Sequence, residues 1–477
     1  MVLTDGRPLP RVGRTSSSGR RVNQSIPQHH IVLKPAPKAL TSSPVNTGDG
    51  CAKEGAGELD AEAGQMNRIE ADYQLRTTKS QEIQRRAERV MPGGDTRTSV
   101  YHEPYPLTIV RGQGAFIWGA DGNRYIDLLG NYTSLVHGHA YPPIVEAIES
   151  AAHSGTAWAA RSPAQVELAE LLTERIASVE QVRFCNSGSE AGMLAAQLAR
   201  HVTRRELLLM AGQGYHGSYD DLELGLARQH GEHTIVAEFG NSEEFERILG
   251  DRGGQIAAVF LEPVLGAGGV VQPPEGFLSR IANAARRVGA LFVLDEVITL
   301  RLSYGGAQEL FEVSPDLTMM GKIIGGGLPV GAIGGRRELL ACFDPRNPAV
   351  LHHSGTFNGN PATCAAGLVS MKELTVPRIR TMEIQARQLA TELEREARQI
   401  ELRMSVRQAG SLMNVVFAGE SLEETGRLHH LFHLACLNHG VFIAPRGMLA
   451  LSTVITSELL AEICDRIASA LRETAAA

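Results

Sequence analysis

Between residues 182 and 294 the chain alternates short apolar runs with segments of helical character. The apolar runs predict strands at 182–185, 207–210, 234–236, 256–261 and 291–294, and the segments between them predict helices at 189–201, 242–249 and 277–288. Strands that are apolar throughout are buried on both faces, and helical connections favour parallel pairing. The sequence therefore predicts an α/β fold with a mostly parallel central sheet.

The segments on either side of this region have a different pattern. Before it we predict a charged helix at 80–90, two antiparallel strands over 107–128, and helices at 143–152 and 165–176. After it come a long charged helix at 377–398, short strands at 414–417, 441–443 and 450–452, and a last helix at 457–473. We expect a large domain over 131–370 and a smaller α+β domain built from 66–130 and 371–477.

The first 65 residues differ again in composition. Residues 1–47 carry seven Lys or Arg and one acid, Asp5, so they hold a net charge of +6 in a chain whose total is -7. They are rich in Pro and Ser and lack apolar periodicity, so we predict that residues 1–65 form a disordered tail. A transit peptide, an added leader or a wrong start codon are alternatives that stay open.

Composition excludes several classes of protein. A net charge of -7 gives no support to nucleic-acid binding, and no apolar run approaches the length of a membrane span. The six cysteines are scattered and form no CxxC pair, which is typical of reduced thiols. We therefore expect a cytoplasmic protein without nucleic-acid or membrane partners.

Three motifs suggest other functions, but their surroundings do not match the binding sites those functions need. Gly212 to Gly217 spells GxGxxG after a strand, but the segment 218–233 has little of the helical pattern that a dinucleotide site needs. Gly321-Lys322 resembles part of a phosphate loop, yet Ile follows the lysine. His429 and His433 have a spacing that can bind metal, although a packed histidine face explains them better. We expect no metal site.

Another set of residues offers three chemical handles. Small residues over 186–191 lie between a strand and a helix, where backbone N–H groups can bind a phosphate. Asp295 ends a buried strand, where a carboxylate can hold a protonated ring nitrogen. Lys322 is flanked by apolar residues, and loss of water makes an amine reactive toward aldehydes. Each has a structural alternative, namely a helix cap, a turn acid and a surface lysine. Together they match phosphate, pyridine nitrogen and aldehyde, the handles of pyridoxal 5'-phosphate.

These residues also resemble a known family, the class III (subgroup II) aminotransferases of pyridoxal-phosphate fold type I. The matching segments lie in family order: NSGSEA at 186–191, GYHG at 214–217, LEP at 261–263, LDEV at 294–297, MGKIIGGGLPVGAIGG at 320–335 and SGTFNGNP at 354–361. The resemblance is closest to glutamate-1-semialdehyde aminomutases and β-phenylalanine aminotransferases. Thr299-Leu300-Arg301-Leu302 departs from the Thr-Gly-Phe-Arg pattern of the aminomutases and is nearer the second group.

The resemblance implies a role for individual residues. Lys322 would bond to the cofactor and move the substrate proton, and Asp295 would keep the ring nitrogen protonated. The remaining cofactor contacts implied are Gly188 and Ser189 on the phosphate, Thr356 on the same phosphate from the neighbouring subunit, Tyr215 and Val297 on the two ring faces, and Glu262 near the ring oxygen. His216 is expected to be structural. Arg97, Tyr132 and Arg446 are the expected substrate contacts.

The expected activity is transfer of an amino group from a β-amino acid, aromatic by resemblance, to a 2-oxo acid such as 2-oxoglutarate or pyruvate. The expected assembly is a homodimer with shared active sites. The alternatives are an aminomutase of the glutamate-1-semialdehyde type and a non-catalytic pyridoxal-phosphate-fold protein, with a dinucleotide oxidoreductase the weakest.

Overall fold

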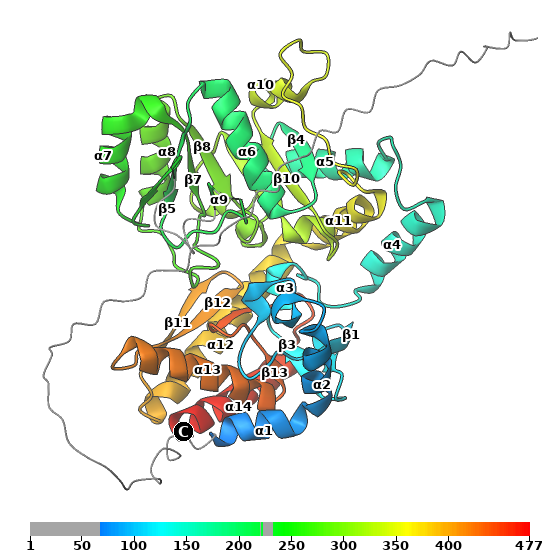
Figure 1. The fold of residues 1–477 in the computed structure, drawn as a ribbon, viewed down its shortest axis with the longest axis vertical. Helices are drawn as coiled ribbons and strands as arrows, with labels where there is room; N and C mark the ends of the chain where they lie inside the picture. The colour runs from blue at the N-terminus through cyan, green and yellow to red at the C-terminus, as the bar shows by residue number, and fades with distance from the viewer. Residues whose placement is uncertain (1–66, 220, 223–231) are drawn as a thin grey trace, which may run out of the picture. The chain divides into compact units, whose positions relative to one another are not determined.

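The computed structural model describes residues 67–219, 221–222 and 232–477, so the tail predicted for 1–65 lies outside the described residues. Within them, a central sheet has the strand order β4-β10-β9-β8-β7-β5-β6 (Figure 1). Its strands are β4 (Gln181–Cys185), β5 (Leu207–Ala211), β6 (Thr234–Ala237), β7 (Ile256–Leu261), β8 (Leu291–Asp295), β9 (Leu317–Gly321) and β10 (Gly331–Gly335). The strands from β9 to β6 pair in parallel, whereas β10 is antiparallel to both neighbours. The prediction of a mostly parallel sheet in an α/β fold is confirmed.

Helices cover both faces of this sheet. α6 (Gly188–Thr203) packs through Leu194 and Leu198 against one face, in a cluster that includes Met319. α7 (Ser242–Arg252) and α8 (Phe277–Arg287) pack against the other face through Phe245 and Phe277. Every residue of β7 is buried, as expected for a strand covered on both sides.

Two further sheets lie outside the central region, and one of them combines residues from both sides of it. One has the order β1-β2-β3-β13, formed by β1 (Ile109–Gln113), β2 (Phe116–Gly119), β3 (Arg124–Asp127) and β13 (Val441–Phe442). The other has the order β11-β12-β14, formed by β11 (Met404–Ala409), β12 (Leu412–Phe417) and β14 (Met448–Ala450). β13 pairs in parallel with β3, so segments far apart in the sequence share one sheet.

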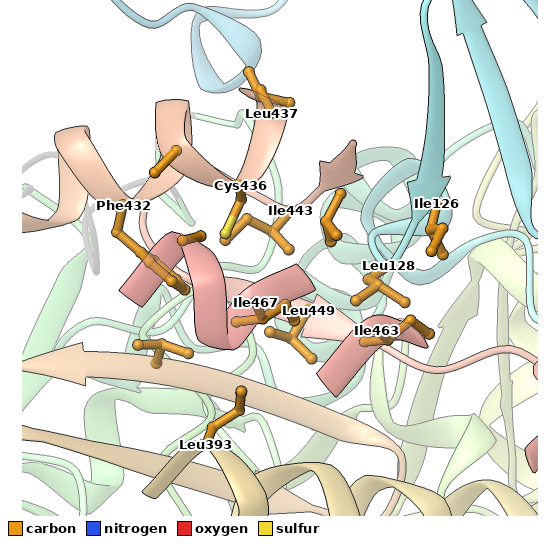
Figure 2. Packing of buried hydrophobic residues seen from close by; sticks show 14 of the residues in the cluster. Ile126, Leu128, Leu393, Phe432, Cys436, Leu437, Ile443, Leu449, Ile463 and Ile467 are labelled. Atoms are coloured by element: carbon orange, nitrogen blue, oxygen red, sulfur yellow. The ribbon is translucent and has the colours of Figure 1, made fainter. Parts of the chain in front are cut away.

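A single hydrophobic cluster joins these segments. Figure 2 shows Ile126 and Leu128 facing Ile463 and Ile467, with Phe432 nearby in the same cluster. The helices around it are α1 (Arg68–Arg76), α12 (Val376–Gln399), α13 (Leu422–Asn438) and α14 (Ser457–Ala475). The remaining helices are α2 (Thr78–Ala87), α3 (Gly130–Thr133), α4 (Pro142–Ser154), α5 (Pro163–Arg175), α9 (Ala307–Leu310), α10 (Arg337–Leu340) and α11 (Pro361–Glu373).

Some predicted elements differ from the observed ones. The segment 107–128 contains β1, β2 and β3 instead of two strands, because Gly114 takes a left-handed backbone (φ +56°) and allows an additional turn. The sequence did not predict β9, β10, β11 or α11. The described cysteines are all free, while Cys51 lies outside the described residues. Among the described helices, none has the length and apolar character needed to cross a membrane.

Candidate active site

The predicted cofactor residues gather where strands of the central sheet end. Asp295 is the last residue of β8, Glu262 follows β7 directly, and Lys322 follows β9 directly. Gly188 and Ser189 begin α6, shortly after β4. Carboxyl ends of parallel strands lie at one edge of a sheet, which is where α/β proteins bind ligands. The fold thus brings together residues that are more than a hundred positions apart.

The Asp295 carboxylate is buried and held by two hydrogen bonds. Its Oδ1 accepts a hydrogen bond from the Val297 amide at 3.0 Å, and its Oδ2 lies 2.9 Å from Nδ1 of His216. His216 is itself buried, at 1% exposure. An ionised carboxylate only accepts, so the His216 ring donates from Nδ1. We expected His216 to be merely structural from the sequence, and its contact with Asp295 was missed; its position after β5, at the same edge, was the available signal.

Lys322 has an unusual backbone and an unusual environment. Its φ angle is +49°, in the left-handed region that lysine rarely adopts and that is often found at functional sites. The loss of water around its partly buried amine lowers the pKa of Lys322, while the nearby carboxylates of Asp295 and Glu262 oppose that shift. A lowered pKa keeps more of the amine neutral and nucleophilic.

Glu262 is a second buried carboxyl group at this edge. Its side-chain oxygens accept hydrogen bonds from the amides of Tyr215 at 3.0 Å and Gly266 at 2.9 Å. Burial first, and then the neighbouring charge of Asp295, raise the pKa of Glu262 to about 7. The side chain of Tyr215 is 38% exposed, and its hydroxyl lies 3.1 Å from the Ser218 Oγ.

The turn at the start of α6 places helix N–H groups beside a glycine. Ser187 caps the helix by accepting a hydrogen bond from the Glu190 amide at 3.1 Å, and the Ser189 Oγ accepts one from the Ser218 amide at 3.1 Å. A Cβ atom on Gly188 would lie 3.2 Å from Val297, so a larger side chain would crowd this turn. A helix N-terminus with exposed N–H groups attracts negative charge.

Thr356 stands apart from this cluster. Its side chain is exposed, and the described residues give it no hydrogen bond. The nearby Asn358 Oδ1 accepts a hydrogen bond from the Asn186 side chain at 2.8 Å, which ties the segment to the turn at 186–191. A contact of Thr356 with a phosphate in another subunit stays a prediction.

The three predicted substrate residues lie on segments that meet. Nη1 of Arg97 donates to the Asn131 side chain at 2.8 Å, and the Tyr132 hydroxyl donates to the Ser99 carbonyl. Arg446 is exposed in a turn between Ala444 and Met448, and those two residues share a hydrophobic cluster with Tyr132. Arg97 and Tyr132 are therefore coupled through neighbouring residues, and the turn that carries Arg446 is anchored in the same cluster.

The competing motifs have other environments. The segment from Gly212 to Gly217 is followed by no helix in the described stretch up to residue 219. Within it, the Tyr215 amide donates a hydrogen bond to Glu262 instead of binding a ligand phosphate. The His433 ring is buried, and its centroid lies 4.5 Å from that of the His102 ring. His430 is hydrogen-bonded to the Glu70 carboxylate at 2.9 Å. Within the described residues, no group of three or more His, Cys, Asp or Glu side chains is arranged so that it could hold a metal ion.

Residues 98–471 match the family described as aminotransferase class-III. The chain belongs to this family. Class-III aminotransferases have fold type I, so the predicted fold class and family are confirmed. The protein is a pyridoxal-phosphate-dependent transaminase of that class.

Individual relatives differ in their activities. A glutamate-1-semialdehyde 2,1-aminomutase from Desulforudis audaxviator is 40% identical over 402 residues, covering 78% of this chain and 92% of the relative. A β-phenylalanine transaminase from Variovorax paradoxus is 36% identical over 381 residues, covering 77% and 87%. The crystal structure of an ω-transaminase from Sphaerobacter thermophilus has a TM-score of 0.80 and 37% identity, covering 83% of this chain and 97% of that one.

The residues present fit pyridoxal 5'-phosphate. The Gly188 turn offers helix N–H groups in a place that a Cβ atom would crowd, Asp295 offers a buried carboxylate, and Lys322 offers an amine with a lowered pKa. These groups match the phosphate, the ring nitrogen and the aldehyde.

Proposed function

We propose that this aminotransferase moves an amino group from an aromatic β-amino acid to a 2-oxo acid such as 2-oxoglutarate or pyruvate. The observation that carries the proposal is the pair of linked contacts Arg97–Asn131 and Tyr132–Ser99, beside the cluster that anchors the Arg446 turn. Two guanidinium groups on separate segments suit substrates with one or two carboxylates, because a guanidinium binds a carboxylate through two parallel hydrogen bonds. The β-phenylalanine transaminase relative supports the choice of donor.

In this proposal each residue at the sheet edge has a separate task. When bound, pyridoxal 5'-phosphate supplies an aldehyde that bonds to amines and a ring that accepts electrons. Lys322 Nζ is the amine that would hold the aldehyde, and when free it would take the proton from the substrate carbon next to the amine. Asp295 would keep a proton on the ring nitrogen, and its hydrogen bond with His216 fixes the orientation of that carboxylate. Gly188, Ser189 and Thr356 would bind the phosphate, Glu262 would lie near the ring oxygen, and Tyr215 and Val297 would cover the ring faces.

A glutamate-1-semialdehyde-type aminomutase is the second candidate. The 40% identity to the Desulforudis audaxviator enzyme favours it. An aminomutase moves the amine within one molecule and needs no separate acceptor. A panel of amino donors, assayed with 2-oxoglutarate or pyruvate and followed for release of the new amino acid, separates the two candidates. Turnover of 3-amino-3-phenylpropanoate that depends on the acceptor supports our proposal, and isomerisation of glutamate-1-semialdehyde without any acceptor supports the second.

The two arginines provide a sharper test of the donor class. We expect Arg446→Ala to raise the KM for carboxylate substrates roughly tenfold or more, the scale of a lost hydrogen bond to a charged group. Arg97→Ala is expected to weaken either the β-amino acid or the acceptor selectively. An amine without a carboxylate, 1-phenylethylamine, is expected to change little in both variants. Equal losses for amines with and without a carboxylate would mean that these arginines do not bind substrate.

A further inference from the structure

Arg301 is a buried cation to which the described residues offer no carboxylate partner. It ends a short 3-10 turn, Thr299–Arg301, that follows the Asp295 segment, and its side chain is 1% exposed. Across residues 67–219, 221–222 and 232–477 the structure records no ion pair for it. Burial lowers the pKa of Arg301 to about 10, which still leaves it charged at neutral pH. Burying such a charge is costly, so its hydrogen-bond partners matter.

The guanidinium of Arg301 joins several distant segments. Its Nε donates to the Ser411 Oγ at 3.0 Å, and its Nη1 donates to the Thr133 carbonyl at 3.4 Å. Its Nη2 donates to the Leu451 carbonyl and lies 3.7 Å from the sulfur of Met382. The planar fork of an arginine can reach these groups at once, which an ammonium cannot.

The contact with Thr133 falls on a strained turn. Asn131, Tyr132 and Thr133 have φ angles of 50°, 52° and 75°, all in the left-handed region. Backbone of this kind costs free energy in non-glycine residues and persists only when the surroundings hold it. The same turn carries Asn131, which binds Arg97, and Tyr132, which binds Ser99.

We infer that Arg301 is a positioning residue for the substrate carboxylate: by holding the Thr133 carbonyl, it keeps the 131–133 turn in the form that places Tyr132 and Arg97. The inference rests on the proposed function, because that proposal makes Arg97 one of two arginines that bind substrate carboxylates, and here we take its ligand to be the carboxylate of the β-amino acid donor. Arg301 touches neither substrate nor cofactor in this scheme and acts through the turn.

Steady-state kinetics of Arg301→Gln with two donors test the inference. We expect the KM for 3-amino-3-phenylpropanoate to rise about tenfold, as for loss of a charged hydrogen bond, while the kcat and KM for 1-phenylethylamine stay within about threefold. Arg175→Gln is the matched control. Arg175 is also buried and donates to the carbonyls of Met371 and Tyr304, but the described residues record no hydrogen bond from it to the 131–133 turn. We expect Arg175→Gln to leave the ratio of the two KM values unchanged.

Several outcomes would overturn the inference. It is wrong if Arg301→Gln weakens both donors equally, or if Arg175→Gln shifts the KM ratio as much. If Arg301→Gln does not fold, Arg301→Lys tests the inference, because lysine keeps the positive charge but lacks the planar guanidinium. An unchanged KM for 3-amino-3-phenylpropanoate in that variant would refute the role. If Arg97→Ala shifts the KM ratio and Arg301→Gln does not, only this inference fails. If neither variant shifts it, the assignment of the donor carboxylate to Arg97 fails as well.

Discussion

Lys322 combines a left-handed backbone with an amine whose pKa is lowered by burial. We predict that Lys322→Ala abolishes transamination, because no other described lysine lies at this edge. Reduction of the wild type with borohydride is expected to fix the cofactor on Lys322, as read by peptide mapping. Lys372→Ala, on the exposed side of α11, serves as the control and is expected to keep full activity. Cofactor attached to another lysine, or a Lys322→Ala rate within about tenfold of wild type, would refute the assignment.

Asp295 offers a second prediction at the same scale. Asp295→Asn is expected to retain bound cofactor and lose most of its kcat, because a neutral amide cannot stabilise a positive ring nitrogen. Asp316→Asn is a matched control. Asp316 is also buried, and its carboxylate accepts a hydrogen bond from the Phe292 amide at 2.8 Å. It lies just before β9, however, whereas Asp295 is the last residue of β8. Absorbance of the bound cofactor and initial rates measure both effects. A normal rate in Asp295→Asn would exclude the proposed role.

Single residues were predictable where the position in a strand decides the location. Asp295 was placed correctly because it ends a predicted strand, whereas Lys322 was identified from its apolar neighbours and from the resemblance, since β9, the strand it follows, was not predicted. The contact between His216 and Asp295 was not predictable in the same way, since it depends on which strands are neighbours in the sheet. Likewise, nothing in the residues near Arg301 indicates that its partners are Thr133, Ser411 and Leu451.

At the scale of elements, the helices and strands with a clear apolar period were predicted, and those shaped by close packing were not. β10 has the sequence Gly-Ala-Ile-Gly-Gly, which weakens any strand prediction. A Cβ atom on Gly331 would lie only 1.9 Å from the Ser187 carbonyl, so glycine is required where β10 passes the phosphate turn. α11 is buried on several sides, including where Gly367 meets the Ile324 carbonyl, so it lacks an amphipathic period.

α13 carries a buried histidine that makes stability depend on pH. Burial lowers the pKa of His433 well below its usual 6.5, so the folded protein keeps it neutral while the unfolded chain takes up a proton below about pH 6.5. The free energy of unfolding is therefore expected to fall as pH decreases from about 6.5, by up to about 1.4 kcal/mol per pH unit for each such group.

Removal of that histidine tests the effect. We predict that His433→Leu has a shallower loss of stability between pH 6.5 and 4.5 in urea unfolding. His153→Gln, at an exposed position on α4, is expected to keep the wild-type pH dependence. The neighbouring His102, whose pKa is lowered to about 4, contributes in the same direction and remains in both variants. Identical slopes in wild type and His433→Leu would contradict the prediction.

At the scale of the whole molecule, the proposal for Thr356 requires two subunits. In a shared site, Lys322 and Thr356 come from different chains. Lys322→Ala and Thr356→Ala proteins, refolded together, would form hybrid dimers in which one site has both wild-type residues. We predict that this mixture is more active than the sum of the separate variants, as measured by initial rate after mixing. Strictly additive rates would place both residues in sites of a single chain.

The parallel pairing of β13 with β3 has a consequence for how the protein is made. Val441 and Phe442 pair with Ile126 and Asp127, so the edge of β3 has no β13 to bond until the ribosome has passed residue 442. A strand edge with free N–H and C=O groups is a template for pairing with other chains. During translation the free edge of β3 therefore stays exposed to neighbouring nascent chains until β13 has been made. We therefore expect that slow release of the finished chain from the ribosome, or truncation before residue 441, favours aggregation over partial folding.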